Sequence, residues 1–191
     1  MHLLQDLDTW VLDLIGNKLG ITKYILYLYK RKNKTMKEYK VILLSGGFDP
    51  VHKGHVECIN KAKELADEVW IGLNNDNWLR RKKGKAFMDE KERAFIMSNL
   101  KSVDWVYIMN PKINSDDTSI DFIDTARVRY IKQNGDLHKG EMAFGNGGDR
   151  TETTTPENDV CDSYGIESVW GLGEKIQSSS WLLEKYLNIA E

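Results

Sequence analysis

The stretch Ser45-Gly46-Gly47-Phe48-Asp49-Pro50-Val51-His52-Lys53-Gly54-His55 decides the fold. It follows residues 41–44, an apolar run with the composition of a buried strand. Its glycines and its Asp-Pro pair are typical of a turn that leads into a helix. A buried strand followed by a glycine turn and a helix start aims backbone N–H groups at phosphate. We therefore predict a nucleotide site here.

Two histidines, His52 and His55, lie three residues apart on either side of Gly54. At this spacing both imidazoles can face one side of the first helical turn, where the positive end of the helix dipole points. Taken alone, Gly46-Gly47 is only a tight turn and Asp49-Pro50 only a helix start. A plain connection needs no pair of imidazoles, which favours the nucleotide site. A metal site is the alternative, but no third ligand stands at a metal-motif spacing, so we assign none.

Residues 47–55 resemble the G-x-F-D-x-x-H-x-G-H signature of the nucleotidyltransferase superfamily, which includes cytidylyltransferases and adenylyltransferases. Only the usual Thr before Phe48 is replaced, by Gly47. The resemblance is to the glycerol-3-phosphate cytidylyltransferase and heptose-1-phosphate nucleotidyltransferase types, and it extends over residues 41–187. It implies an α/β enzyme that joins a nucleoside triphosphate to a phosphorylated acceptor and releases pyrophosphate.

Composition limits the partners and the compartment. A chain of 191 residues suits one domain with an appendage, and a net charge of -2 gives no bulk attraction to nucleic acid or to an anionic membrane. Two cysteines make no disulfide framework. No signal peptide is evident, and no segment reaches the roughly 20 apolar residues of a spanning helix. We expect a cytoplasmic protein without a transmembrane segment.

Two regions are expected. Residues 1–40 read as an amphipathic helical appendage with a basic linker, and residues 41–191 as the nucleotidyltransferase domain. The appendage is also compatible with docking to a membrane surface or a partner. The basic run at 30–37 is more simply explained as a solvated linker.

Strands and helices alternate from Val41 onward, which predicts a Rossmann-like doubly wound parallel sheet of about five strands. The expected strands are 41–45, 68–73, 103–108, 142–144 and 166–170, and the expected helices are 54–66, 88–100 and 119–132. Phe95 is assigned to the buried face of the second helix and Val128 to that of the third. Residues 74–87 and 151–162 are expected to be polar loops, the second a candidate acceptor-binding loop.

Further site residues follow from the resemblance. It implies phosphate contacts from Lys83 and Lys85 in the basic loop and from Arg93 at the next helix start. It also implies a Gly-Gly-Asp turn at Gly147 and Asp149, and a hydroxyl-rich helix start with Ile176, Ser178 and Ser179. Asn146 and Gln177 depart from the related patterns, which usually have Lys and Ser there.

The predicted mechanism is in-line attack by an acceptor phosphate oxygen on the α-phosphorus of CTP or ATP. The catalytic candidates are His52, His55, Lys85 and Arg93, with Mg²⁺ bridging the triphosphate. The nucleotide-binding candidates are Gly46, Gly47, Phe48, Asp49, Gly54, Gly147, Asp149, Ile176, Ser178 and Ser179.

Three functions remain open at this point. The first is a polyol- or sugar-phosphate nucleotidyltransferase, and the second is a nicotinamide-mononucleotide or pantetheine-phosphate type of adenylyltransferase. The third is a silent nucleotide-binding module that docks a partner through its N-terminal helices. Dimers are common among the relatives, so a homodimer is compatible with the resemblance, although no residue indicates it.

Overall fold

The computed structural model of the chain describes residues 37–110, 118–148, 150–174 and 176–187. The described residues from 38 onward belong to one compact unit. The expected appendage lies outside the described residues except for its last four positions. The boundary at residue 40 therefore stays a prediction, although the first strand, β1 (Tyr39–Gly46), begins just before it.

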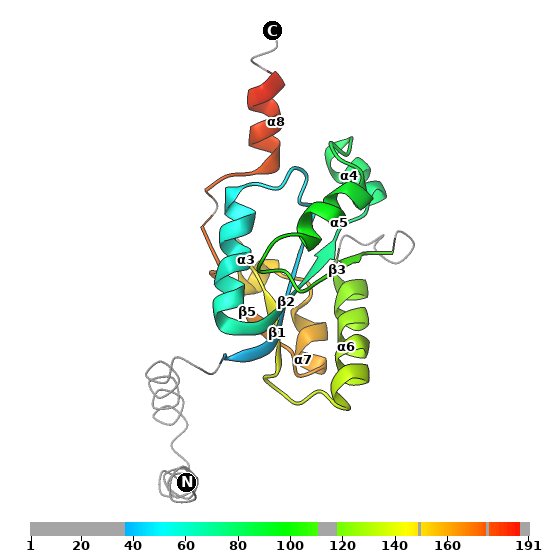
Figure 1. The fold of residues 1–191 in the computed structure, drawn as a ribbon, viewed down its shortest axis with the longest axis vertical. Coiled ribbons are helices and arrows are strands. Elements are labelled where there is room, and N and C mark those ends of the chain that lie inside the picture. The colour runs from blue at the N-terminus through cyan, green and yellow to red at the C-terminus, as the bar shows by residue number, and fades with distance from the viewer. Residues whose placement is uncertain (1–36, 111–117, 149, 175, 188–191) are drawn as a thin grey trace, which may run out of the picture. The chain divides into compact units, whose positions relative to one another are not determined.

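The sheet has five parallel strands in the order β3-β2-β1-β4-β5 (Figure 1). The other strands are β2 (Ala66–Leu73), β3 (Trp105–Ile108), β4 (Met142–Gly145) and β5 (Glu167–Val169). The chain leaves β1 toward β2 and β3, then returns to add β4 on the opposite side of β1. This reversal opens a crevice at the carboxyl ends of β1 and β4, where ligands of such sheets bind. The predicted fold class is confirmed.

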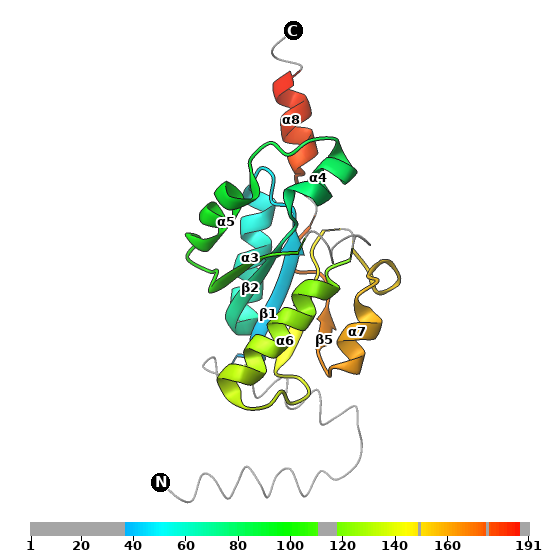
Figure 2. The same cartoon turned by 90° about the vertical axis from the view of Figure 1, so that its right-hand side faces the viewer.

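Helices cover both faces of the sheet (Figure 2). Helices α3 (Lys53–Leu65) and α5 (Glu90–Ser98) pack on one face, and α6 (Ile120–Asn134) and α7 (Asn158–Ser163) pack on the other. Side chains of β1 alternate between the two cores: Ile42 and Leu44 join the first, Val41 and Leu43 the second. Each strand is therefore buried on both sides, as a parallel sheet requires.

Two segments expected to be loops contain helices. Residues 74–87 include α4 (Asp76–Lys83), which begins at the capping side chain of Asn75 and ends at Gly84, whose φ is 79°. Leu79 anchors this helix in the core. Residues 151–162 include the short 3-10 turn η1 (Glu152–Thr154) and most of α7, anchored by the buried Cys161. Each segment has a single buried apolar residue, which is too weak a periodic signal to predict a helix.

The buried faces of α5 and α6 also differ from expectation. Phe95 is 70% exposed, whereas Arg93 on the same helix is 0% exposed. Val128 is exposed on α6, whose buried stripe instead includes Phe122, Ala126 and Tyr130. A short helix can carry apolar side chains on more than one face, and packing against the sheet decides which face is buried. The last helix is α8 (Ser179–Leu187). No described helix is long and apolar enough to span a membrane.

Substitutions at two phenylalanines test this packing. Phe122→Ala should lower the free energy of unfolding by about 3 to 5 kcal/mol, because the Phe122 ring packs directly on Gly72 of β2. Phe95→Ala, its matched control, should change it by less than about 0.5 kcal/mol. Urea denaturation measures both values, and equal losses would contradict the assignment of the two faces.

Candidate active site

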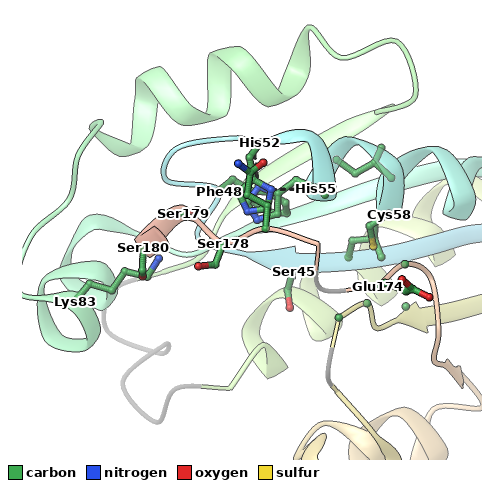
Figure 3. Close-up of a pocket in the computed structure, with 18 residues that line it drawn as sticks. Ser45, Phe48, His52, His55, Cys58, Lys83, Glu174, Ser178, Ser179 and Ser180 are labelled. Carbon is green, nitrogen blue, oxygen red and sulfur yellow. Dashed lines mark hydrogen bonds between the residues drawn. The ribbon is translucent and has the colours of Figure 1, made fainter. Parts of the chain in front are cut away.

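A cavity of about 290 Å³ lies at the carboxyl ends of β1 and β4 (Figure 3). The cavity is lined by the end of β1, the starts of α3 and α8, the end of α4, and the loops after β4 and β5. The lining residues are Leu44, Ser45, Phe48, His52, Gly54, His55, Cys58, Ile59, Lys83, Gly145, Gly147, Gly148, Gly173, Glu174, Gln177, Ser178, Ser179 and Ser180.

His52 and His55 cap helix α3 reciprocally. The His55 backbone N–H donates to His52 Nδ1 at 3.4 Å, and the His52 backbone N–H donates to His55 Nδ1 at 3.3 Å. The two rings stack with their centroids 3.6 Å apart. Because each Nδ1 accepts a hydrogen bond, the neutral ring carries its proton on Nε2. The helix start therefore supplies two Nε2–H donors at the cavity.

Electrostatics keeps both rings neutral. Burial first, then His52 and Lys83, lower the pKa of His55 from its usual 6.5 to about 3. Burial and Lys83 lower the pKa of His52 as well. Around neutral pH the pair is uncharged, so it donates hydrogen bonds without bringing two positive charges together.

The glycine turn before the helix is tightly packed. A Cβ on Gly47 would lie 3.0 Å from Leu79, and one on Gly54 would lie 3.3 Å from the His52 ring. Phe48 has a φ of 49°, a left-handed conformation that is strained for a bulky residue. Its ring meets His55 edge-on with centroids 4.9 Å apart. The strained turn thus places the Phe48 ring in contact with His55.

Asp49 and Arg93 hold loops rather than line the cavity. The buried Asp49 carboxylate accepts hydrogen bonds from the backbone N–H groups of Phe87 and Met88, at 2.7 and 2.9 Å. Arg93 donates to the carbonyls of Met88, Gly47 and Asn74 and to the carboxylate of Asp76. Neither side chain is among the lining residues, so their expected contacts with a nucleotide stay predictions. Through these hydrogen bonds both side chains fix the backbone of the loops next to the cavity.

Basic residues reach the cavity from the end of α4. Lys83 lines it, whereas Lys85, one of the four residues expected to be catalytic, is exposed beyond Gly84 and outside the lining. Figure 3 shows Lys83 with Ser180 at one end of the cavity and Cys58 with Glu174 at the other. The cavity therefore has a basic end and an acidic end.

The loops after β4 and β5 meet beside α3. The Gly148 backbone N–H donates to the Gly173 carbonyl at 2.8 Å, and a Cβ on Gly147 would lie 2.9 Å from the Cys58 sulfur. A side chain at position 147 would therefore require Cys58 to shift. Asp149 lies outside the described residues. Gly46 and Gly47 stand behind the lining, with Gly46 against the Phe48 ring.

The hydroxyl-rich segment before α8 lies against the glycine turn. Ser179 donates to the Pro50 carbonyl at 2.9 Å, and the Trp181 backbone N–H donates to Ser178 Oγ at 3.2 Å. Ile176 is exposed and packs near Gly54 rather than lining the cavity. The structure thus brings Ser178 and Ser179 together with both histidines.

Several lining residues were not foreseen as site residues: Ser45, Cys58, Glu174 and Ser180. Cys58 stands three residues after His55 and so shares its side of the helix. Gln177, noted only as a departure from the related patterns, also lines the cavity. The position of Glu174 follows from the packing of two loops, for which the sequence carries no periodic signal.

A family model described as cytidylyltransferase-like matches residues 43–142, just over half of the chain. The chain belongs to the cytidylyltransferase-like family. A curated relative, the bifunctional protein HldE of Syntrophotalea carbinolica, is 33% identical over 143 residues, which cover 74% of this chain and 24% of the relative. HldE of Helicobacter pylori (strain P12) is 34% identical over 111 residues, 57% of this chain and 23% of the relative. The chain thus spans about a quarter of the length of these relatives.

A solved structure has the same fold. It is the bifunctional NMN adenylyltransferase/ADP ribose pyrophosphatase of Francisella tularensis, with a TM-score of 0.55 and 15% identity, covering 78% of this chain and 42% of that chain. At this identity the likeness concerns the fold alone. The resemblance to the superfamily drawn from the signature is confirmed, whereas the roles of individual site residues remain predictions.

The neutral histidine pair makes stability depend on pH. Below about pH 6.5 the unfolded chain binds a proton at His55 that the folded protein does not, so the unfolding free energy falls as the pH falls. From about pH 7 to about pH 5 this amounts to about 2 kcal/mol. His55→Asn keeps an acceptor near the Nδ1 position and should remove that loss, unlike His138→Asn at an exposed position. Urea denaturation at the two pH values measures the unfolding free energy of each variant. An equal loss of unfolding free energy between the two pH values in both variants would refute the prediction.

Proposed function

We propose that the protein is a nucleotidyltransferase that joins CTP or ATP to a phosphorylated sugar or polyol and releases pyrophosphate. The observation that carries this proposal is the reciprocal capping of α3, which leaves two Nε2–H donors at a cavity on the reversal point of a parallel sheet. Family membership supports the reaction class, and the resemblance to sugar- and glycerol-phosphate enzymes supports the acceptor class.

The reaction needs positioning and charge stabilisation. An oxygen of the acceptor phosphate forms a bond to the α-phosphorus, and the bond from that phosphorus to the β-phosphate oxygen breaks. Pyrophosphate carries away the electron pair, so no proton transfer is required. The Nε2–H groups of His52 and His55 would donate to phosphate oxygens as charge shifts toward the leaving group.

Other residues would hold the rest of the triphosphate. Lys83 and the backbone and hydroxyl groups at the start of α8 supply positive potential at one end of the cavity. Lys85, two residues beyond Lys83, is proposed for the outermost phosphate. Arg93 would act through the Gly47 carbonyl that it fixes, as a positioning residue rather than a phosphate ligand. Gly147, Phe48 and Gly54 would shape the nucleotide cavity.

Mg²⁺ is proposed to enter with the nucleotide. The described residues contain no group of three or more His, Cys, Asp or Glu side chains that could hold a metal ion. Both Asp49 oxygens are engaged by backbone N–H groups. Phosphate oxygens and water are the ligands that Mg²⁺ then has available, which matches its usual binding in phosphoryl-transfer enzymes.

Pyrophosphate release tests the function. CTP and ATP are each combined with a panel of sugar and polyol phosphates, and release above the acceptor-free rate is expected for at least one pair. For that pair, His55→Asn should lower kcat by about 10²- to 10³-fold, because it removes the Nε2 donor and retains an acceptor at the helix cap.

His138→Asn, at an exposed position away from the cavity, is the matched control and should keep full activity. If no pair in the panel released pyrophosphate above the acceptor-free rate, the enzymatic function would be contradicted and the non-catalytic nucleotide-binding module favoured. Full activity of the His55 variant would contradict the role of the pair.

A further inference from the structure

A polar network of Arg150, Glu157, Ser119 and Ser45 reaches the cavity from the α6 side of the sheet. Arg150 Nη1 donates to Glu157 Oε2 at 3.5 Å, and Glu157 Oε1 accepts the Ser119 backbone N–H at 2.8 Å. The Ser119 hydroxyl then donates to Ser45 Oγ at 2.8 Å. Ser45 lines the cavity. The network therefore links Arg150, which lies on the loop after β4 outside the cavity lining, to the cavity through Glu157 and Ser119.

Arg93 and Arg150 differ in exposure and in the number of acceptors that their guanidinium groups contact. Arg93 is 0% exposed, and its guanidinium donates to four acceptors within the protein. The Arg150 side chain is 43% exposed and, among the described residues, makes a single long contact with Glu157. An arginine carries five N–H donors, so most of those on Arg150 remain for a ligand.

The acceptor of the Arg150 contact and the turn after Arg150 are both ordered by other contacts. Glu157 is 0% exposed, so its carboxylate has a fixed position beneath the guanidinium. The turn that follows is closed by the Thr151 backbone N–H donating to Thr154 Oγ1 and by Thr155 Oγ1 donating to the Thr151 carbonyl, both at 2.8 Å. The Arg150 guanidinium thus lies beside an ordered carboxylate and an ordered turn, with most of its N–H donors exposed.

Ser45 carries the network into the cavity. Its oxygen accepts the Ser119 proton, so its own hydroxyl proton is left to donate to a ligand oxygen. Ser45 lies away from the end of the cavity where Lys83 and Ser180 gather (Figure 3). A second anion bound there would be separated from the leaving pyrophosphate, which is the arrangement that in-line transfer requires.

We propose that Arg150 and Ser45 form the subsite for the phosphate group of the acceptor, with Glu157 and Ser119 as positioning residues. This inference rests on the proposed function, because it assigns the second substrate of that reaction. Arg150 binds the acceptor phosphate by charge-assisted hydrogen bonds, and Ser45 orients the oxygen that attacks the α-phosphorus.

Inorganic phosphate is the probe for this subsite. The full chain, labelled with ¹⁵N, is saturated with the α,β-methylene analogue of CTP or ATP so that the nucleotide phosphate positions are filled. Phosphate is then titrated while the amide signals of Ser45 and Ser119 are followed. Saturable shifts are expected in the wild type, and Arg150→Met should weaken phosphate binding by about tenfold or more.

Matched variants separate charge from fold. Arg150→Lys should restore part of the phosphate affinity, and Lys132→Met, an equal charge change at the far end of α6, should leave it unchanged. All variants should bind the analogue as the wild type does. Phosphate binding that is absent from the wild type, or equal in Arg150→Met, would overturn the inference while leaving the nucleotide site intact. Failure of both analogues to shift His52 and His55 would overturn the proposed function and this inference with it.

Discussion

The reciprocal hydrogen bonds between His52 and His55 are the interaction on which the site depends. A helix start leaves backbone N–H groups without partners, and here the two imidazoles accept two of them. The cap fixes the tautomer and stacks the rings, and burial keeps them neutral. Gly54 lies between them because a side chain would press on the His52 ring. The spacing of the signature thus stabilises the helix start and, in the proposed function, also places the two donors for a ligand.

The hydrogen bonds of the buried Arg93 are a second constraint on the loops next to the cavity. Arg93 joins the turn after β1, the loop after β2 and the start of α5 through hydrogen bonds to Gly47, Asn74, Asp76 and Met88. The buried guanidinium is stable there because its donors are satisfied and one partner is a carboxylate. The ends of two strands are therefore fixed by contacts made outside the cavity. Binding needs little rearrangement of these loops, which favours catalysis by positioning.

The sequence predicts most of the fold because apolar strands and a glycine turn leave strong local patterns. It also identifies the histidine pair and the serines before α8, whose spacing has a direct chemical meaning. It does not predict that Arg93 is enclosed, because an arginine on a helix looks the same whether it faces a ligand or a ring of carbonyls. Phe95 is wrongly predicted to be buried for a similar reason, because helix α5 carries apolar side chains on two faces and only one of them is buried. The Arg150 network depends on contacts between residues far apart in the chain, for which a single sequence has no periodic signal.

The ring ¹⁵N chemical shifts of His52 and His55 test most directly whether helix capping prepares two neutral donors for a nucleotide. At about neutral pH the free protein should show an unprotonated Nδ1 and a protonated Nε2 in both rings. Addition of the α,β-methylene analogue of CTP or ATP should shift the Nε2 signals as they donate to phosphate. Imidazolium rings or a proton on Nδ1 in the free protein, or Nε2 signals that respond to neither analogue, would contradict the account.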